Sequence, residues 1–254
     1  MTRIQFMNTE IDNLTMDEAL AEIDRLIQQN GNAYVVTPNV DHLVQMERGG
    51  PLCDVYRDAD LIVADGKPLI WISKWYGTPL KEKISGSDLF PRLCALAEQR
   101  GYSMFFLGAA EGVAARAAEN LKKRFPALQI VGTYSPARGF ERNPEELEKI
   151  YRMINDAAPH ILIVALGCPK QELFIRNSRG HIHVPLSLGL GATLDFEAGK
   201  VKRAPRWMAD HGLEWLFRIT QDPKRLAKRY LVDDMKIVGM AFKYRKQAKA
   251  RKQR

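Results

Sequence analysis

The sequence has few cysteines and no long apolar run, and both shortages narrow its class. Its three cysteines, Cys53, Cys94 and Cys168, are odd in number and form no CxxC pair. This usage predicts a reducing compartment with neither a disulfide framework nor a zinc site. No stretch approaches the roughly 20 apolar residues that a membrane-spanning helix requires. The N-terminus also lacks the apolar core of a signal peptide. We therefore expect a cytoplasmic protein whose membrane contact is peripheral.

Short apolar runs alternate with longer amphipathic stretches along the first 200 residues. The runs expected to be strands cover residues 33–37, 61–64, 103–107, 129–133, 160–166 and 184–188. Most are apolar on both faces, which is typical of parallel strands covered by helices on each side. Thr15 and Glu18 form a capping-box pattern that opens a helix to about Gln29, and residues 111–124 and 145–155 are helically periodic. The alternation predicts an α/β fold with a Rossmann-like, doubly wound and mainly parallel sheet.

Charge divides the chain into two parts. Residues 200–254 contain 17 Lys and Arg against 5 Asp and Glu, whereas residues 1–199 have a net charge of −4. We expect an α/β catalytic core over residues 1–199 and a helical basic appendage over residues 200–254. The last 20 residues carry eight basic side chains and no acid. They are interpreted as a helix lying on an anionic membrane surface, with a disordered basic tail as the alternative. No recognition fold supports nucleic-acid binding.

Four loops that follow predicted strands carry residues suited to a ligand site. They contain Thr37 and Asn39, Asp65, Gly108, and Gln171. Each loop alone has a simple structural explanation as a helix cap, a turn or a helix start. Ligands of open α/β sheets bind at the carboxyl ends of the strands, where all four loops are expected to lie. Their coincidence at one edge favours a functional site.

A second carboxylate motif, Asp58-Ala59-Asp60, has the DxD spacing of metal-nucleotide sites in sugar transferases. It precedes the strand at residues 61–64 and is therefore expected at the opposite edge from Asp65, so we do not assign it a metal. The basic appendage contributes arginines instead. Arg225 and Arg229 are four residues apart on a predicted helix, and arginine suits bidentate binding of a diphosphate. A solvated charged face is the alternative.

Taken together, these motifs resemble the WecG/TagA/CpsF family of bacterial glycosyltransferases. The resemblance spans about residues 10–232 in the family's order. The matching stretches are Thr37-Pro38-Asn39, Ala64-Asp65-Gly66, Gly86-x-Asp88, Leu107-Gly108, Gly167-x-Pro169-Lys170-Gln171-Glu172, Gly191-Ala192-x-x-Asp195, Ala198-Gly199-Lys200, Arg203-Ala204-Pro205, Gly212-Leu213-Glu214-Trp215 and Pro223-x-Arg225.

The resemblance implies an inverting transfer of a hexose from a UDP-sugar to a polyprenyl-diphosphate-linked sugar. The hexose implied is N-acetylmannosamine, its uronic acid or glucose. Such enzymes serve teichoic acid, enterobacterial common antigen or exopolysaccharide synthesis at the inner face of the cell membrane. No metal or other cofactor is required in this interpretation. The apolar surface of the appendage leaves open docking on its own core, on a second copy in a homo-oligomer, or on lipid.

The resemblance also implies roles for individual residues. Asp65 is the candidate catalytic base, and Thr37, Asn39 and Gln171 line the substrate pocket. Lys83 stands where members commonly have an arginine, so it offers a point charge in place of a bidentate contact. The remaining substrate-binding candidates are Gly108, Arg203, Arg218, Arg225 and Arg229, with Lys228 as an alternative to Arg229. Asp195 is the other carboxylate considered for the base, and it is interpreted as structural.

Two other classes remain open from the residues alone. A nucleotide-cofactor-dependent oxidoreductase uses the same kind of fold, but the fingerprint GxGxxG is missing. A non-catalytic module that binds a membrane or nucleic acid would need only the basic tail.

Overall fold

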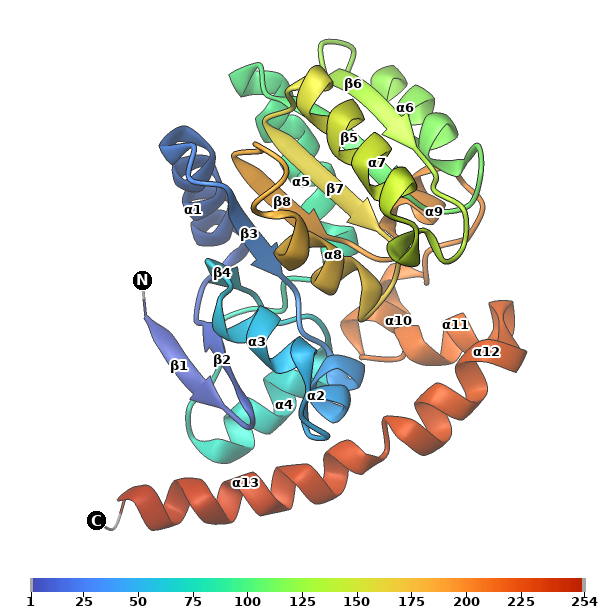
Figure 1. Ribbon diagram of the computed structural model, residues 1–254. Helices are drawn as coiled ribbons and strands as arrows, with labels where there is room; N and C mark the ends of the chain where they lie inside the picture. The colour runs from blue at the N-terminus through green and yellow to red at the C-terminus, as the bar shows by residue number, and fades with distance from the viewer. Residues whose placement is uncertain (1, 253–254) are drawn as a thin grey trace.

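The computed structural model describes residues 2–252, except for the side chains at positions 206, 210, 225 and 248–252. Its centre is a six-stranded sheet in the order β4-β3-β8-β7-β5-β6, in which every neighbouring pair is parallel (Figure 1). The strands are β3 (Ala33–Val36), β4 (Leu61–Ile62), β5 (Ser103–Gly108), β6 (Gln129–Tyr134), β7 (Ile161–Ala165) and β8 (Leu186–Gly189). All six predicted strands are present, and the doubly wound α/β class is confirmed.

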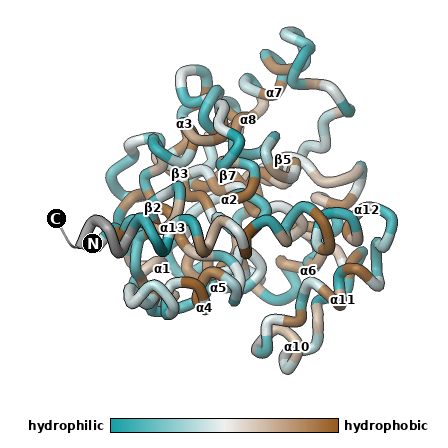
Figure 2. Tube along the Cα trace, turned by 90° about the horizontal axis from the view of Figure 1, so that it is seen from below, coloured by the Kyte–Doolittle hydropathy of each residue, from teal (hydrophilic) through white to brown (hydrophobic). Residues whose placement is uncertain are grey.

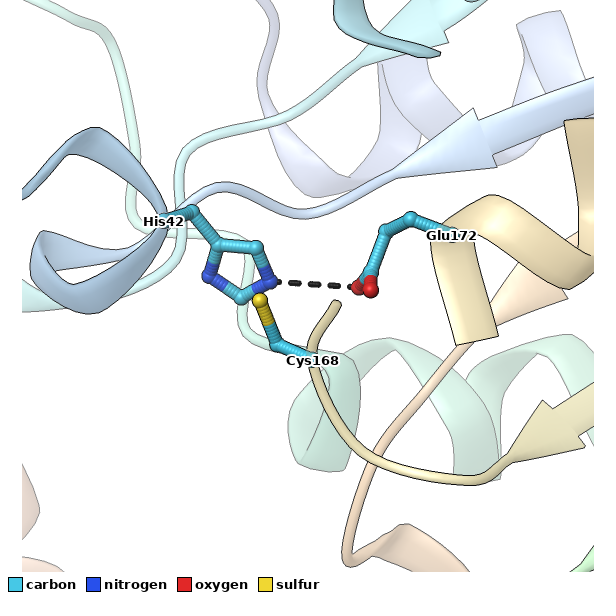
Figure 3. Close-up of side chains that lie close together, drawn as sticks. All are labelled: His42, Cys168 and Glu172. Atoms are coloured by element: carbon cyan, nitrogen blue, oxygen red, sulfur yellow. Dashed lines mark hydrogen bonds and ion pairs between the residues drawn. The ribbon is translucent and has the colours of Figure 1, made fainter. Parts of the chain in front are cut away.

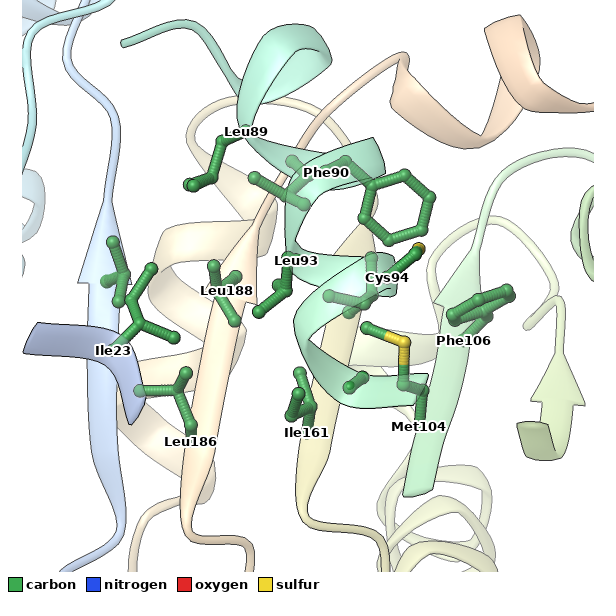
Figure 4. Close-up of a cluster of buried hydrophobic side chains, with 14 of the residues drawn as sticks. Ile23, Leu89, Phe90, Leu93, Cys94, Met104, Phe106, Ile161, Leu186 and Leu188 are labelled. Carbon is green, nitrogen blue, oxygen red and sulfur yellow. The ribbon is translucent and has the colours of Figure 1, made fainter. Parts of the chain in front are cut away.

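Helices cover both faces of this sheet, and each layer has its own apolar cluster. One face carries α1 (Met16–Gln29), α5 (Gly86–Arg100), α6 (Val113–Arg124) and α9 (Thr193–Glu197). Figure 4 shows this cluster, in which Ile23 of α1 and Phe90 of α5 face Leu188 of β8 and Phe106 of β5. The other face carries α2 (Val40–Met46), α3 (Pro51–Arg57), α4 (Lys67–Tyr76), α7 (Pro144–Ala157) and α8 (Lys170–Ser178). A short 3₁₀ turn, Phe140–Arg142, precedes α7.

The start of α1 follows the predicted capping box. The Thr15 hydroxyl accepts a hydrogen bond from the Glu18 backbone N–H at 3.3 Å, and Glu18 accepts one from the Thr15 N–H at 2.7 Å. Two of the N–H groups at the helix start are thereby satisfied by side chains.

An N-terminal hairpin lies outside the sequence prediction. β1 (Arg3–Phe6) pairs antiparallel with β2 (Thr9–Asp12) and forms a separate two-stranded sheet. The Arg3 guanidinium pairs with the Asp12 carboxylate at 2.9 Å. The other Asp12 oxygen accepts the backbone N–H of Ile62 at 2.9 Å, which fixes the hairpin to the start of the edge strand β4.

The basic C-terminal part is helical, as expected. α10 (Arg206–Asp210), α11 (Glu214–Gln221), α12 (Pro223–Lys228) and a π-helical turn (Arg229–Asp233) pass along the end of the sheet to which the strand arrows point (Figure 1). They lead into α13 (Lys236–Lys252), which Figure 2 shows from below, laid across the molecule. None of the helices in residues 2–252 has the length and apolar character needed to cross a bilayer.

Contacts hold α13 against α2 and α4, so the described part of the tail is a docked helix. Ile237, Met240 and Ala241 are buried. The Tyr76 hydroxyl donates to the Ala241 carbonyl at 2.8 Å, and Lys243 pairs with Glu47 at 2.5 Å. The boundary expected between residues 199 and 200 stays a prediction.

Candidate active site

The carboxyl ends of β3, β4, β7 and β8 bring three of the four suspected loops together. The Asp65 backbone N–H donates to the Pro38 carbonyl at 2.9 Å, which joins the loops after β3 and β4. The Gln171 side-chain oxygen accepts from the backbone N–H of Gly167 at 3.2 Å and of Gly191 at 2.9 Å, which joins the loops after β7 and β8. The site therefore begins as a set of loops connected by backbone groups.

Asp65 occupies the end of β4, where an apolar run gives way to a glycine. Gly66 has φ +104° and opens α4, a conformation that suits glycine. The Asp65 side chain is half-buried, and no group among the described residues donates a hydrogen bond to its carboxylate. Burial raises the pKa of Asp65 to about 6, and the nearby Glu214 carboxylate adds to the rise, while Arg218, Lys83 and His42 oppose it. The carboxylate is thus ionised at neutral pH, yet it is more basic than an exposed aspartate.

Thr37 and Asn39 lie on the loop between β3 and α2. Thr37 is buried, and Asn39 is the N-cap of α2. The Asn39 side-chain oxygen is 3.4 Å from the His42 backbone N and 2.8 Å from His42 Nδ1. The cap therefore fixes both the helix start and the orientation of the imidazole ring.

Gln171 is buried, with 4% of its surface exposed, and its amide holds three groups of the protein. Besides the two backbone N–H groups that its oxygen accepts, its nitrogen donates to Glu172 Oε1 at 2.7 Å. A Cβ on Gly189 would lie 3.1 Å from the Gln171 side chain, so β8 also approaches it closely. The Gln171 amide therefore connects the loops after β7 and β8 and positions Glu172.

Gly108 has a packing reason to be glycine. Its φ is +109°, and a Cβ there would lie 2.5 Å from the Ala165 carbonyl oxygen of β7. No other residue fits this backbone without displacement of a neighbouring strand. Its role in substrate binding stays a prediction.

Lys83 and Arg203 meet at the first turn of α5. Lys83 pairs with Asp88 at 2.6 Å, the Ser85 hydroxyl donates to the same oxygen at 2.6 Å, and Arg203 pairs with the other oxygen. Burial raises the pKa of Asp88, but these donors overcome it and bring the pKa down to about 2. The pair between Arg203 and Asp88 connects the C-terminal segment to the first turn of α5.

The other predicted arginines lie on either side of this point. Arg218 of α11 is 3.4 Å from Glu214 and sits over the Phe196 ring at 5.2 Å. Its pKa is lowered by burial, but Tyr230, Glu214 and Asp65 raise it, so the net shift is upward. Arg229 pairs with Asp41 in the first turn of α2 at 3.3 Å. The Arg225 side chain lies outside the described residues.

The two carboxylate alternatives have protein partners. Asp58 pairs with Arg176 at 2.8 Å and Asp60 with Arg179 at 2.9 Å, where the chain enters β4. This is the edge opposite Asp65, as the order of the sequence predicts. The Asp195 carboxylate lies 3.6 Å from Lys200.

The structure adds a buried polar cluster that the sequence did not indicate. His42 Nε2 is 3.2 Å from Glu172 Oε1, and Cys168 lies beside the imidazole (Figure 3). Burial lowers the pKa of His42, but Cys168 and Glu172 raise it, and the net pKa is well above its ordinary value. Glu214 was also missed as a neighbour of Asp65. The only sequence signals were the position of Glu172 next to Gln171 and the capping-box spacing of Asn39 and His42.

The structure thus places Thr37, Asn39, Asp65 and Gln171 on joined loops at one sheet edge, with Lys83 and Arg218 close enough to act on the Asp65 carboxylate. Arg203 pairs with Asp88, the partner of Lys83. Gly108 ends β5 at the same edge of the sheet, and Arg229 lies beside α2. Their roles toward a substrate stay predictions.

Comparisons with known proteins agree with the motifs. The sequence matches the glycosyl transferase WecG/TagA/CpsF family over residues 4–251. A curated relative from Bacillus spizizenii, named N-acetylglucosaminyldiphosphoundecaprenol N-acetyl-beta-D-mannosaminyltransferase, is 32% identical over 225 residues, which cover 89% of this chain and 84% of the relative. A Bacillus subtilis protein of the same name is 31% identical over 199 residues, which cover 78% and 75%.

Proposed function

The chain belongs to the WecG/TagA/CpsF family of glycosyl transferases, and from that premise we propose that it transfers N-acetylmannosamine from UDP to a polyprenyl-diphosphate-linked sugar. The names of the two Bacillus relatives support this donor sugar and this acceptor. Their names also specify a β-linked product, which an α-linked nucleotide donor gives by inversion at the anomeric carbon. Family membership leaves the oxidoreductase and the non-catalytic module without support.

The observation that carries the proposal is the Asp65 carboxylate. In the transfer, Asp65 takes the proton of the acceptor hydroxyl while that oxygen forms a bond to the anomeric carbon. The bond from this carbon to the diphosphate oxygen breaks, and UDP leaves with the electron pair. A base works best with a pKa close to the operating pH, and burial raises the pKa of Asp65 to about 6. Because no described group hydrogen-bonds its carboxylate, the oxygens are free to accept the proton.

Cationic side chains beside Asp65 suit the departing diphosphate. Lys83 and Arg218 act on Asp65 from two parts of the chain, and Arg203 pairs with Asp88, the partner of Lys83. Positive groups held where negative charge develops stabilise a transition state, and charge-assisted hydrogen bonds from arginine are the strong ones. In this interpretation UDP draws Arg203 and Arg218 from their present pairs with Asp88 and Glu214.

We further propose that the protein works peripherally at the anionic inner face of the cell membrane, where a polyprenyl-linked acceptor resides. The surface of α13 combines exposed apolar side chains with lysines and an arginine. Together with Met235, which precedes the helix, this surface includes Val238, Phe242, Lys243, Arg245 and Lys246. Co-sedimentation with vesicles tests this: binding to anionic vesicles and not to zwitterionic ones is expected, whereas equal binding to both would contradict it.

The decisive experiment is a transfer assay with the purified full chain. It offers UDP-N-acetylmannosamine, its uronic acid analogue, UDP-N-acetylglucosamine and UDP-glucose in turn, with polyprenyl-diphosphate-linked N-acetylglucosamine as acceptor. We expect transfer from UDP-N-acetylmannosamine and a β-linkage by NMR. Transfer only from another donor, or an α-linked product, would overturn the proposed substrate or the inversion.

A further inference from the structure

Three side chains from two segments of the chain converge beside the candidate site. They are His42 in the first turn of α2, Cys168 in the loop after β7, and Glu172 in the first turn of α8 (Figure 3). His42 and Glu172 are 130 residues apart in the chain. One ligand atom from each of the three lies within 4.8 Å of the other two, and no other group of this kind occurs in the described part of the chain.

Hydrogen bonding assigns the protons on the imidazole. His42 Nδ1 is 2.8 Å from the Asn39 side-chain oxygen, which can only accept, so Nδ1 carries a proton. The Asn39 backbone N–H also approaches Nδ1, but at 3.4 Å this contact is weaker. In the neutral imidazole Nε2 is then a bare lone pair, and it faces the Glu172 carboxylate at 3.2 Å. Two acceptors at this separation require a positive charge between them.

A proton on Nε2 would satisfy that contact but would leave other buried groups without partners. Glu172 is 2% exposed and Tyr56 is 3% exposed. Glu172 Oε2 and the Tyr56 hydroxyl are both buried and have no hydrogen-bond partner. The Tyr56 ring is 6.0 Å from the imidazole, which places its side chain at the same cluster. An unpaired buried polar group costs free energy, so two of them in one place indicate a missing occupant.

We propose that His42, Cys168 and Glu172 bind one divalent transition-metal ion of the zinc type. Imidazole nitrogen, thiolate sulfur and carboxylate oxygen are the ligands that zinc takes in proteins. Ligand bonds of about 2.0–2.3 Å in a tetrahedral site separate the ligand atoms by roughly 3.3–3.7 Å. The 3.2 Å between Nε2 and Oε1 is already close to this, and rotation of the Cys168 side chain closes the rest.

Neighbouring residues already orient the ligands. Asn39 fixes the ring of His42, Gln171 donates to Glu172 at 2.7 Å, and Gln45 donates to the Cys168 sulfur at 3.5 Å. Such contacts behind the ligands are typical of metal sites. A water in the fourth position would give the Tyr56 hydroxyl its partner. On binding, the Cys168 thiol and the protonated His42 ring each release a proton to solvent, and the thiolate sulfur and Nε2 form bonds to the ion.

The ion would act on the structure of the site and not on the transfer step. It would join the loops after β3 and β7, which carry Thr37 and Asn39 on one side and Gln171 on the other. The spacing of cysteines in the sequence predicted no zinc site, because the site uses a single cysteine, and His42 comes from a segment 130 residues away from Glu172. The inference stands on these contacts and is independent of the proposed sugar transfer.

The test uses the full-length protein, freed of any histidine tag and stripped with a chelator. After dialysis against Zn²⁺, elemental analysis should find about one zinc per chain, and Co²⁺ in its place should give a thiolate-to-cobalt charge-transfer band. Zinc should also protect Cys168 from alkylation, as mapped by mass spectrometry. Cys53, which is half-buried and outside the cluster, is the internal control and should react equally with and without zinc.

Matched variants separate this site from adventitious binding. Cys168→Ser should remove the cobalt band and weaken zinc binding by roughly tenfold or more, whereas Cys53→Ser should leave both unchanged. Zinc should raise the Tm of the wild type and of Cys53→Ser, but not that of Cys168→Ser. The cobalt band and the alkylation of Cys168 are measured on the wild type, so they test the proposal even if a variant fails to fold. Absence of the cobalt band, or alkylation of Cys168 unaffected by zinc, would overturn the proposal in favour of a protonated His42 paired with Glu172.

Discussion

The sheet edge around Asp65 and the C-terminal segment hold their polar and charged side chains in opposite ways. At the sheet edge, Gln171, Glu172 and His42 are buried. Backbone N–H groups donate to Gln171, the α2 cap residue Asn39 orients His42, and both Gln171 and His42 contact Glu172. In the segment from α10 to α13, the charged side chains are held by ion pairs between partly exposed groups, such as Arg203 with Asp88 and Lys243 with Glu47. No residue of α11 is buried.

This difference suggests separate roles for the two regions: the sheet edge fixes the position of a reacting group, and the C-terminal segment supplies positive charge. A carboxylate at the end of a buried strand keeps its position whatever binds beside it. Partly exposed ion pairs each contribute little to stability, so their members exchange partners at small cost. We expect the core to supply the base and the C-terminal segment to supply cations that reorganise around the diphosphate.

The largest effect on kcat should come from a substitution at the sheet edge, where Asp65 lies. Asp65→Asn keeps the shape of the side chain but cannot accept the proton, so kcat should fall by roughly 10²–10⁴-fold with an unchanged Tm. Asp58→Asn is the control, because Asp58 is a paired carboxylate at the opposite sheet edge. Transfer rates within a few-fold of wild type for Asp65→Asn would show that the base lies elsewhere.

A smaller loss of kcat is expected when a cationic side chain of the C-terminal segment is removed. Arg218→Ala removes a guanidinium beside Asp65, and kcat should fall by roughly 10²-fold, the effect of removing one donor to a developing negative charge. Arg218→Lys should recover part of this loss. Arg176→Ala, which removes an arginine paired with Asp58, is the matched control. An Arg218→Ala enzyme that changed only KM would assign this residue to binding alone.

The pH dependence tests whether the two regions act on one another. The base must be ionised, so kcat/KM should fall as the pH drops through about 6, the raised pKa of the buried Asp65. Glu214 of α11 contributes to that rise. Glu214→Gln should therefore move the acid limb to lower pH and change the rate at neutral pH by less than about twofold. If the acid limb of the kcat/KM profile does not move, the Glu214 carboxylate of α11 does not affect the pKa of Asp65.

The smallest effect should be found far from the site. Lys243→Ala removes the ion pair with Glu47 that helps to hold α13 on the core. The pair is partly exposed, so the free energy of unfolding should fall by about 1 kcal/mol or less in urea titrations. The difference from wild type should shrink further in high salt. A loss of several kcal/mol would show that this segment is held as tightly as the sheet edge.

The sequence predicted the sheet well because its strands are apolar on both faces and bounded by polar loops. All six runs became strands, and the Thr15 capping box set the start of α1. The hairpin of β1 and β2 was missed because each strand has only four residues, and its position depends on the contact of Asp12 with Arg3 and Ile62. Contacts between distant residues leave no local pattern.

The same reason explains the site. Asp65 was identifiable because an acid that ends an apolar strand is visible in the sequence. The pKa of Asp65 was not, because Glu214 and Arg218 reach it from a segment about 150 residues later. The cluster of His42, Cys168 and Glu172 was missed for the same reason, since its members meet only when β3 and β7 are assembled.

The central place of β8 has a consequence for how the protein is made. β8 is the last strand of the sheet to leave the ribosome, yet it lies between β3 and β7. Until residues 186–189 emerge, the nascent chain can form only two separate strand sets, β3 with β4 and β5 to β7, each with an open edge. Insertion of one four-residue strand then joins them. A chain that ends before this point exposes two unpaired strand edges that can pair with other chains. Late translational stops are therefore expected to cause more aggregation than early ones.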